Sequence, residues 1–78
     1  MRKYPGARRQ RAVITALKRI REAAELSQRG LSGMLKSHET YAWEVEHGQH
    51  GVRVEEFIAW CEACGVDAAE ELRGIQQK

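Results

Sequence analysis

Four side chains that could recognise another molecule lie close together in the middle of the chain: Glu39, Thr40, Trp43 and Glu44. Their spacing places them on the outer face of a predicted helix from about Glu39 to Glu46. Glutamate can accept a hydrogen bond from the cytosine amino group, threonine can bond a base edge or a phosphate, and tryptophan can press on a thymine methyl group. We therefore expect this face to contact DNA bases. The alternatives are a solvated acidic face, a docking surface for a basic partner anchored by Trp43, or burial of Trp43 in the core.

The predicted helix is the second of two short helices between Leu26 and Val52. Ser27 is a start signal for the first helix, Lys36 and Ser37 interrupt it, and Gly48 stops the second. Two helices joined this closely cross steeply and leave the second one projecting, with a length that fits the DNA major groove. The stretch predicts a helix-turn-helix and DNA binding.

The amino-terminal part of the chain is strongly basic. Residues 1–21 hold eight Lys or Arg and no acid, whereas residues 22–78 hold five basic and eleven acidic side chains. We expect a basic arm over residues 1–10, followed by the helix-turn-helix domain over residues 11–76. The arm would attract phosphates by counterion release, unless it is only a solvated tail. The phosphate ligands that we expect are Arg2, Lys3, Arg8, Arg9, Arg11, Gln28, Lys36, His50 and Arg53, and His47 could add a contact when it is protonated.

Three more helices are predicted around this pair. The first begins near Ala7 to Gln10, the fourth runs from about Val54 to Cys64, and Asp67 caps the fifth with Glu70 as its capping-box partner. The fold class is therefore all-α, a compact five-helix domain with a helix-turn-helix. The residues expected to face inward are Val13, Leu17, Ile20, Ala24, Leu31, Met34, Leu35, Ala42, Val45, Phe57, Ile58, Trp60, Cys61 and Cys64.

The two cysteines, Cys61 and Cys64, have a spacing that also occurs in thiol-redox pairs and half zinc sites. No second cysteine pair exists, and the three histidines lack the usual ligand spacing. Because residues three apart share a helix face, we expect both thiols to pack in the core. We expect no metal and no cofactor. The sequence has no phosphate loop and no nucleophile beside a base, so an enzyme is not expected.

From Leu17 to about Leu72 the sequence resembles the Cro and phage-repressor type of helix-turn-helix protein, often called XRE-like. The residues that carry the resemblance are Leu26-Ser27-Gln28, Leu31 with Leu35, Ala42 with Val45, Glu46 with Gly48, and the run from Phe57 to Cys64-Gly65-Val66. The sequence departs from the family pattern at Gly30, at Lys36, where a turn glycine is usual, and at Arg53, where a capping Asp or Ser is usual.

The resemblance implies a lambda-repressor-like domain that binds operator DNA as a dimer, usually to repress. By position, it implies that Gln28 bonds a phosphate and buttresses the first base contact, and that Glu39, Thr40, Trp43 and Glu44 face the bases. It also implies that Arg21 and Glu46 form a structural pair and that Gln49–Arg53 follow the DNA backbone.

These features together predict a sequence-specific transcriptional regulator, a homodimeric autorepressor of a phage, mobile-element or antitoxin type. Its target would be double-stranded DNA carrying an inverted repeat, and Leu72 with Ile75 would contribute to the dimer interface. The alternative is a protein-interaction module of helix-turn-helix shape that binds a basic partner such as a toxin; an anti-repressor is another possible partner. With no apolar run long enough for a membrane span and no signal peptide, we expect a cytoplasmic protein.

Overall fold

The computed structural model describes residues 7–76, which form five α-helices joined by short connections. These helices are α1 (Ala7–Ala23), α2 (Gln28–Met34), α3 (Tyr41–Glu46), α4 (Val54–Ala63) and α5 (Ala68–Gln76). The all-α, five-helix prediction is confirmed. No helix among the described residues is long and apolar enough to cross a membrane.

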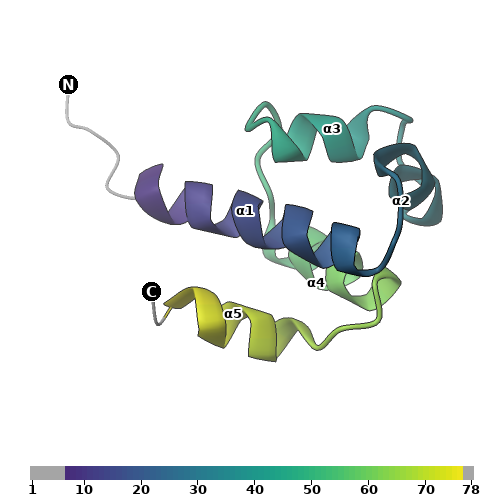
Figure 1. Ribbon diagram of the computed structural model, residues 1–78. Helices are drawn as coiled ribbons and strands as arrows, with labels where there is room; N and C mark the ends of the chain where they lie inside the picture. Colours follow the sequence, from purple (N-terminus) through teal and green to yellow (C-terminus); the bar gives the residue numbers. More distant parts are fainter. Residues whose placement is uncertain (1–6, 77–78) are drawn as a thin grey trace, which may run out of the picture.

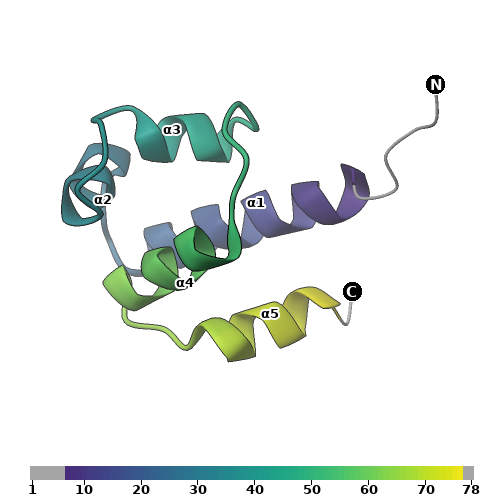
Figure 2. The same cartoon turned by 180° about the vertical axis from the view of Figure 1, so that it is seen from behind.

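The helices are arranged in three tiers. Figures 1 and 2 show α3 along one edge of the molecule, α5 along the opposite edge, and α1 and α4 between them. The short helix α2 sits at one end, beside α3 and at the carboxyl end of α1 (Figure 1). The longest dimension of the molecule is 37 Å. The helix-turn-helix pair therefore occupies one edge and leaves α5 remote from it.

The core is built from residues of the first four helices. Its fully or almost fully buried apolar members are Ala16, Leu17, Ile20, Leu31, Tyr41, Ala42, Val45, Phe57, Trp60 and Cys61. The indole of Trp60 crosses this core, and its Nε1–H donates to the Leu17 carbonyl at 3.0 Å. A buried indole N–H needs such a partner, because leaving it unpaired would cost about 1–3 kcal/mol.

Several predicted burials differ from the structure. Met34 is 53 % exposed and Ile58 is 39 % exposed, so the expectation that both face inward is wrong. Met34 is the last residue of the seven-residue α2, whereas Leu35, which follows it, packs against the core. Tyr41, for which the sequence analysis predicted neither burial nor exposure, is buried.

Four helices end in the same way, with a residue in the left-handed conformation after the last turn. Glycine occupies this position after α3 and α4, at Gly48 and Gly65, but Glu25 and Lys36 occupy it after α1 and α2. The amide at Lys36 donates to the Gly33 carbonyl and the following amide donates to the Ser32 carbonyl, both at 3.0 Å. This is the Schellman pattern, which satisfies the last carbonyls of a helix. The departure from the family pattern at Lys36 thus leaves the turn geometry intact.

The hydrogen bonds at the starts of the helices agree less closely with the capping residues predicted from the sequence. Ser27 caps α2 as predicted, with its Oγ accepting from the Gly30 amide at 2.8 Å. Asp67 caps α5 through the Ala69 amide at 3.1 Å, whereas its expected partner Glu70 pairs with Arg73. At the start of α4, where Arg53 cannot accept a bond, the Glu56 carboxylate accepts from the Arg53 amide at 2.9 Å. That contact is the main cause that lowers the pKa of Glu56.

Candidate nucleic-acid interface

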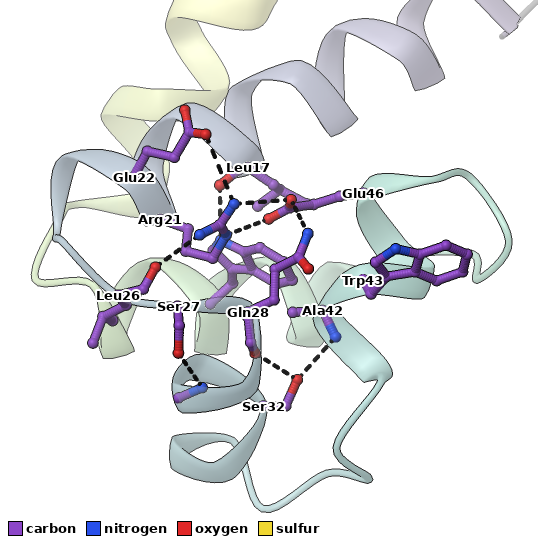
Figure 3. A network of polar contacts seen from close by, with 12 residues as sticks. Leu17, Arg21, Glu22, Leu26, Ser27, Gln28, Ser32, Ala42, Trp43 and Glu46 are labelled. Carbon is purple, nitrogen blue, oxygen red and sulfur yellow. Dashed lines mark hydrogen bonds and ion pairs between the residues drawn. The ribbon is translucent and has the colours of Figure 1, made fainter.

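A single buried hydroxyl, that of Ser32, joins α2 to α3. Its Oγ donates to the Gln28 carbonyl at 2.9 Å and accepts from the Ala42 amide at 3.0 Å (Figure 3). The Ala42 amide is one of the first N–H groups of α3, which have no partner within the helix. Thr40, the residue before α3, makes no capping bond of its own. Ser32 therefore caps α3 from the neighbouring helix and fixes the angle between the two.

A buried ion pair ties α3 to α1. Arg21 Nε donates to Glu46 Oε2 at 2.6 Å and Arg21 Nη2 donates to Glu46 Oε1 at 3.1 Å, a two-bond contact (Figure 3). Arg21 Nη1 also donates to the Leu26 carbonyl at 2.7 Å. Only 2 % of the Glu46 side chain is exposed, and its hydrogen bond to Arg21 is the main cause that raises the pKa of Arg21. Removing one partner of such a pair would leave a buried charge unpaired, which is strongly destabilising.

Gln28 completes this network at the amino end of α2. Its Nε2 donates to Glu46 Oε1 at 2.8 Å, so one of its two N–H donors is used inside the protein. The structure thus brings Arg21, Gln28 and Glu46 together, although the sequence assigned Gln28 to phosphate. Gln28 holds the carboxyl end of α3 from the helix that precedes it.

The acidic side chains on the predicted base-contacting surface all have partners within the protein. Helix α3 starts at Tyr41, two residues later than predicted, so Glu39 and Thr40 lie in the turn before it. Glu39 Oε2 accepts from Arg29 Nη2 at 2.8 Å. Glu44 accepts from the Thr40 hydroxyl at 2.9 Å and lies 3.1 Å from His38 Nε2. These two contacts, with His38 first, lower the pKa of Glu44.

Trp43 points away from the core and away from the polar network (Figure 3). The residue is 40 % exposed, so burial of Trp43 in the core is excluded. One face of the indole stacks on the His47 ring, with centroids 4.0 Å apart, and His47 Nδ1 donates to the Trp43 carbonyl at 2.8 Å. Beside Trp43 is a shallow hollow of about 420 Å³, lined by Gln28, Arg29, Glu39, Thr40 and Trp43. Arg29 and this hollow were missed, because neither is visible in the spacing of a single helix.

The predicted phosphate ligands are dispersed over several elements. Arg8, Arg9 and Arg11 are exposed on the first turns of α1, which begins at Ala7 and therefore takes in the last residues assigned to the arm. Lys36 is exposed in the turn between α2 and α3. Arg53 is exposed at the start of α4, 3.6 Å from Glu55. Arg2 and Lys3 lie outside the described residues.

His50, predicted to bind phosphate, is partly buried beside Tyr41 and Glu56. Its ring packs edge-on against the Tyr41 ring, with centroids 5.0 Å apart, and its Nε2 lies 3.4 Å from Glu56 Oε2. Burial is the main cause that raises the pKa of Tyr41 to about 12. His50 thus helps to cover Tyr41 in the loop that connects α3 to α4.

The two residues expected at a dimer interface differ in burial. Leu72 is 38 % exposed on α5, whereas Ile75 packs against the core. Other exposed apolar side chains lie on α4, at Val54 and Ile58.

Cys61 lies on the core-facing side of α4, and Cys64 directly follows the last residue of that helix. Cys61 is fully buried and Cys64 is partly buried, and both are free thiols. Burial is the main cause that raises the pKa of Cys61 to about 11, and it also raises the pKa of Cys64. No group of three potential metal ligands occurs among residues 7–76.

Comparison with known proteins agrees with this geometry. A family model described as a helix-turn-helix domain matches residues 15–73. No match is found among curated proteins. Among solved structures, the crystal structure of the clp gene regulator ClgR from Corynebacterium glutamicum is similar, with 25 % sequence identity and a TM-score of 0.77, over 88 % of this chain and 73 % of that chain. The chain therefore belongs to the helix-turn-helix family, a family of DNA-binding transcription regulators and not of enzymes, as its resemblance to the Cro and phage-repressor type predicted.

Proposed function

We propose that this protein is a homodimeric, sequence-specific repressor of its own promoter, of the kind used by phages, mobile elements or antitoxin systems. The exposed face formed by Thr40, Trp43 and Glu44 enters the major groove. Lys36, Arg53 and the basic start of α1 contact phosphates. Two protomers bind the halves of an inverted repeat whose centres are about one helical turn, or roughly 34 Å, apart.

The observation that carries the proposal is the ion pair between Arg29 and Glu39 on this face. Without Arg29, both Glu39 and Glu44 would repel a polyanion. Arg29 compensates the charge of Glu39, whereas Glu44 keeps its negative charge, and its contacts with Thr40 and His38 orient the carboxylate, which can accept a hydrogen bond from a cytosine amino group. The exposed Lys36 in the turn before α3 supplies attraction to phosphates.

The rigidity of the pair supports the same proposal. Ser32 caps α3 from α2, and the Arg21, Gln28 and Glu46 network ties both helices to α1. Side chains that read base edges must be held on rigid elements, because a hydrogen bond is lost over a small displacement.

In-vitro selection from a library of randomised duplexes tests the proposal without knowledge of the operator. We expect enrichment of an inverted repeat, and native mass spectrometry should show two protomers on each selected duplex. The intact protein should also lower expression of a reporter placed behind its own upstream DNA. A selection that enriches no sequence would overturn the proposal, and Trp43 would then be tested as the anchor for a basic protein partner.

A further inference from the structure

The hollow beside Trp43 lies between the two helices of the DNA-binding unit. Residues from the start of α2, Gln28 and Arg29, form one side, and Glu39, Thr40 and Trp43 form the other. Its exposed wall is predominantly apolar, although four of the five lining residues are polar. Such a hollow accepts a small apolar group and has hydrogen-bonding groups at its rim.

Thymine has this combination of groups in the major groove. It presents a 5-methyl group next to the O4 acceptor, whereas cytosine presents an amino donor and no methyl group. A methyl group gains free energy when apolar surface is removed from water, and the Trp43 indole supplies such a surface.

Arg29 supplies the complementary donors at the rim. Its Nη2 donates to Glu39 Oε2 at 2.8 Å, and a guanidinium has further N–H donors but no acceptor. The carboxylate of Glu39 therefore orients Arg29, and the remaining donors can bond thymine O4 but not the cytosine amino group.

We propose that the hollow between Arg29 and Trp43 is a thymine-reading site, in which Trp43 contacts the 5-methyl group and Arg29, held by Glu39, donates to O4. This inference rests on the proposed function, because it requires α3 to lie in the major groove. It assigns a specificity role to Arg29, on α2, in addition to the residues of α3.

The methyl contact is tested with the duplex obtained from the selection described above. Each thymine of one half-site is replaced in turn by deoxyuracil, which removes only the methyl group. At one position we expect the Kd of the wild-type protein to rise about fourfold, as expected for one methyl group removed from an apolar contact. Trp43→Ala should bind the thymine and deoxyuracil duplexes equally. Met34→Ala, which removes an exposed apolar side chain outside the hollow, should keep the fourfold difference.

The donor contact is tested at the same base pair. Replacing the thymine with 5-methyl-2-pyrimidinone, which keeps the methyl group but lacks O4, should raise the Kd about ten- to hundredfold for the wild-type protein. Arg29→Ala should bring this ratio close to one, and Glu39→Ala should reduce it.

The outcomes separate the two proposals. If no sequence is selected, the proposed function fails. If a sequence is selected but deoxyuracil has no effect at any position, or has the same effect in Trp43→Ala, the thymine site is wrong while the repressor proposal stands.

Discussion

Ser32 shows how one side chain can set the angle between two helices. The hydroxyl lies inside the protein with both its donor and acceptor functions used, one toward α2 and one toward α3. A buried N–H without a partner costs about 1–3 kcal/mol, and the Ala42 amide has no partner within its own helix. The orientation of α3 thus depends on a side chain that is fully buried.

Ser32→Ala should lower the free energy of unfolding by about 2 kcal/mol, because it leaves the Ala42 amide unpaired. Urea unfolding followed by tryptophan fluorescence measures this change. Ser37→Ala, at an exposed serine in the following turn, is the matched control and should change stability little. Equal stability of the Ser32→Ala variant and the wild type would show that Ser32 is not the cap.

Cys61 should be unreactive in the folded protein. The thiolate is the reactive form, and burial raises the pKa of this thiol to about 11. Because the folded-state pKa is raised, its contribution to stability is complete below the ordinary thiol pKa and is lost as the pH rises through about 11. We expect slow reaction with a disulfide reagent at pH 8 and fast reaction after unfolding in guanidinium. Rapid labelling of Cys61 at pH 8 without unfolding would contradict its burial and support a redox role.

At the scale of the elements, the residues at the helix ends set the shape of the helix-turn-helix formed by α2 and α3. The chain turns from α2 into α3 through Lys36, whose φ is 57°, and from α1 into α2 through Glu25, whose φ is 61°. A side chain in this conformation costs about 1–2 kcal/mol, whereas glycine adopts it readily. The helices on either side therefore hold these two residues in the left-handed conformation, which residues with a side chain disfavour.

Lys36→Gly should raise the free energy of unfolding by about 0.5–1 kcal/mol, because the relief of strain exceeds the extra entropy of an unfolded glycine. Thermal and urea unfolding measure the change. Lys36→Ala removes the same charge without freeing the backbone and should give no such gain. Gly65→Ala should destabilise, because Gly65 has a φ of 77° and a side chain is strained there, although the added Cβ would meet no other atom within 4 Å.

The elements were more predictable from the sequence than the contacts between them. Apolar periodicity and the signals at Ser27, Gly48 and Gly65 gave five helices, because these signals act within a few residues of where they occur. The roles of Ser32 and Tyr41 could not be found in this way, since each depends on another helix across the core. Pairing of Arg29 with Glu39 was missed for the same reason: the two residues lie on opposite sides of a turn whose geometry the sequence leaves open.

At the scale of the whole molecule, α3 and α5 lie along opposite edges, with α1 and α4 between them (Figures 1 and 2). A protein contact made through α5 would therefore leave the α3 edge uncovered. Leu72 is exposed on α5 and can take part in such a contact, whereas Ile75 is already packed against the core of its own chain.

Leu72→Glu should shift the equilibrium from dimer to monomer, because a charge replaces an apolar side chain at the proposed interface. Sedimentation equilibrium over a range of protein concentrations measures the shift. Val54→Glu, at the more exposed apolar residue of α4, provides the comparison. If Val54→Glu dissociates the dimer and Leu72→Glu does not, the interface lies on α4 and its assignment to α5 is wrong.

The central claim is that the α3 face reads bases while the basic residues bind phosphates, and one titration tests it most directly. Labelled duplexes of the protein's own upstream DNA and of a scrambled sequence are titrated at several salt concentrations with three proteins: the wild type, Thr40→Ala with Trp43→Ala, and Arg8→Ala with Arg9→Ala. We predict that the wild type prefers the upstream DNA, that the α3 variant loses this preference, and that the arginine variant binds both duplexes more weakly with a smaller salt slope. Equal binding of both duplexes by the wild type, or an unchanged preference in the α3 variant, would contradict the account.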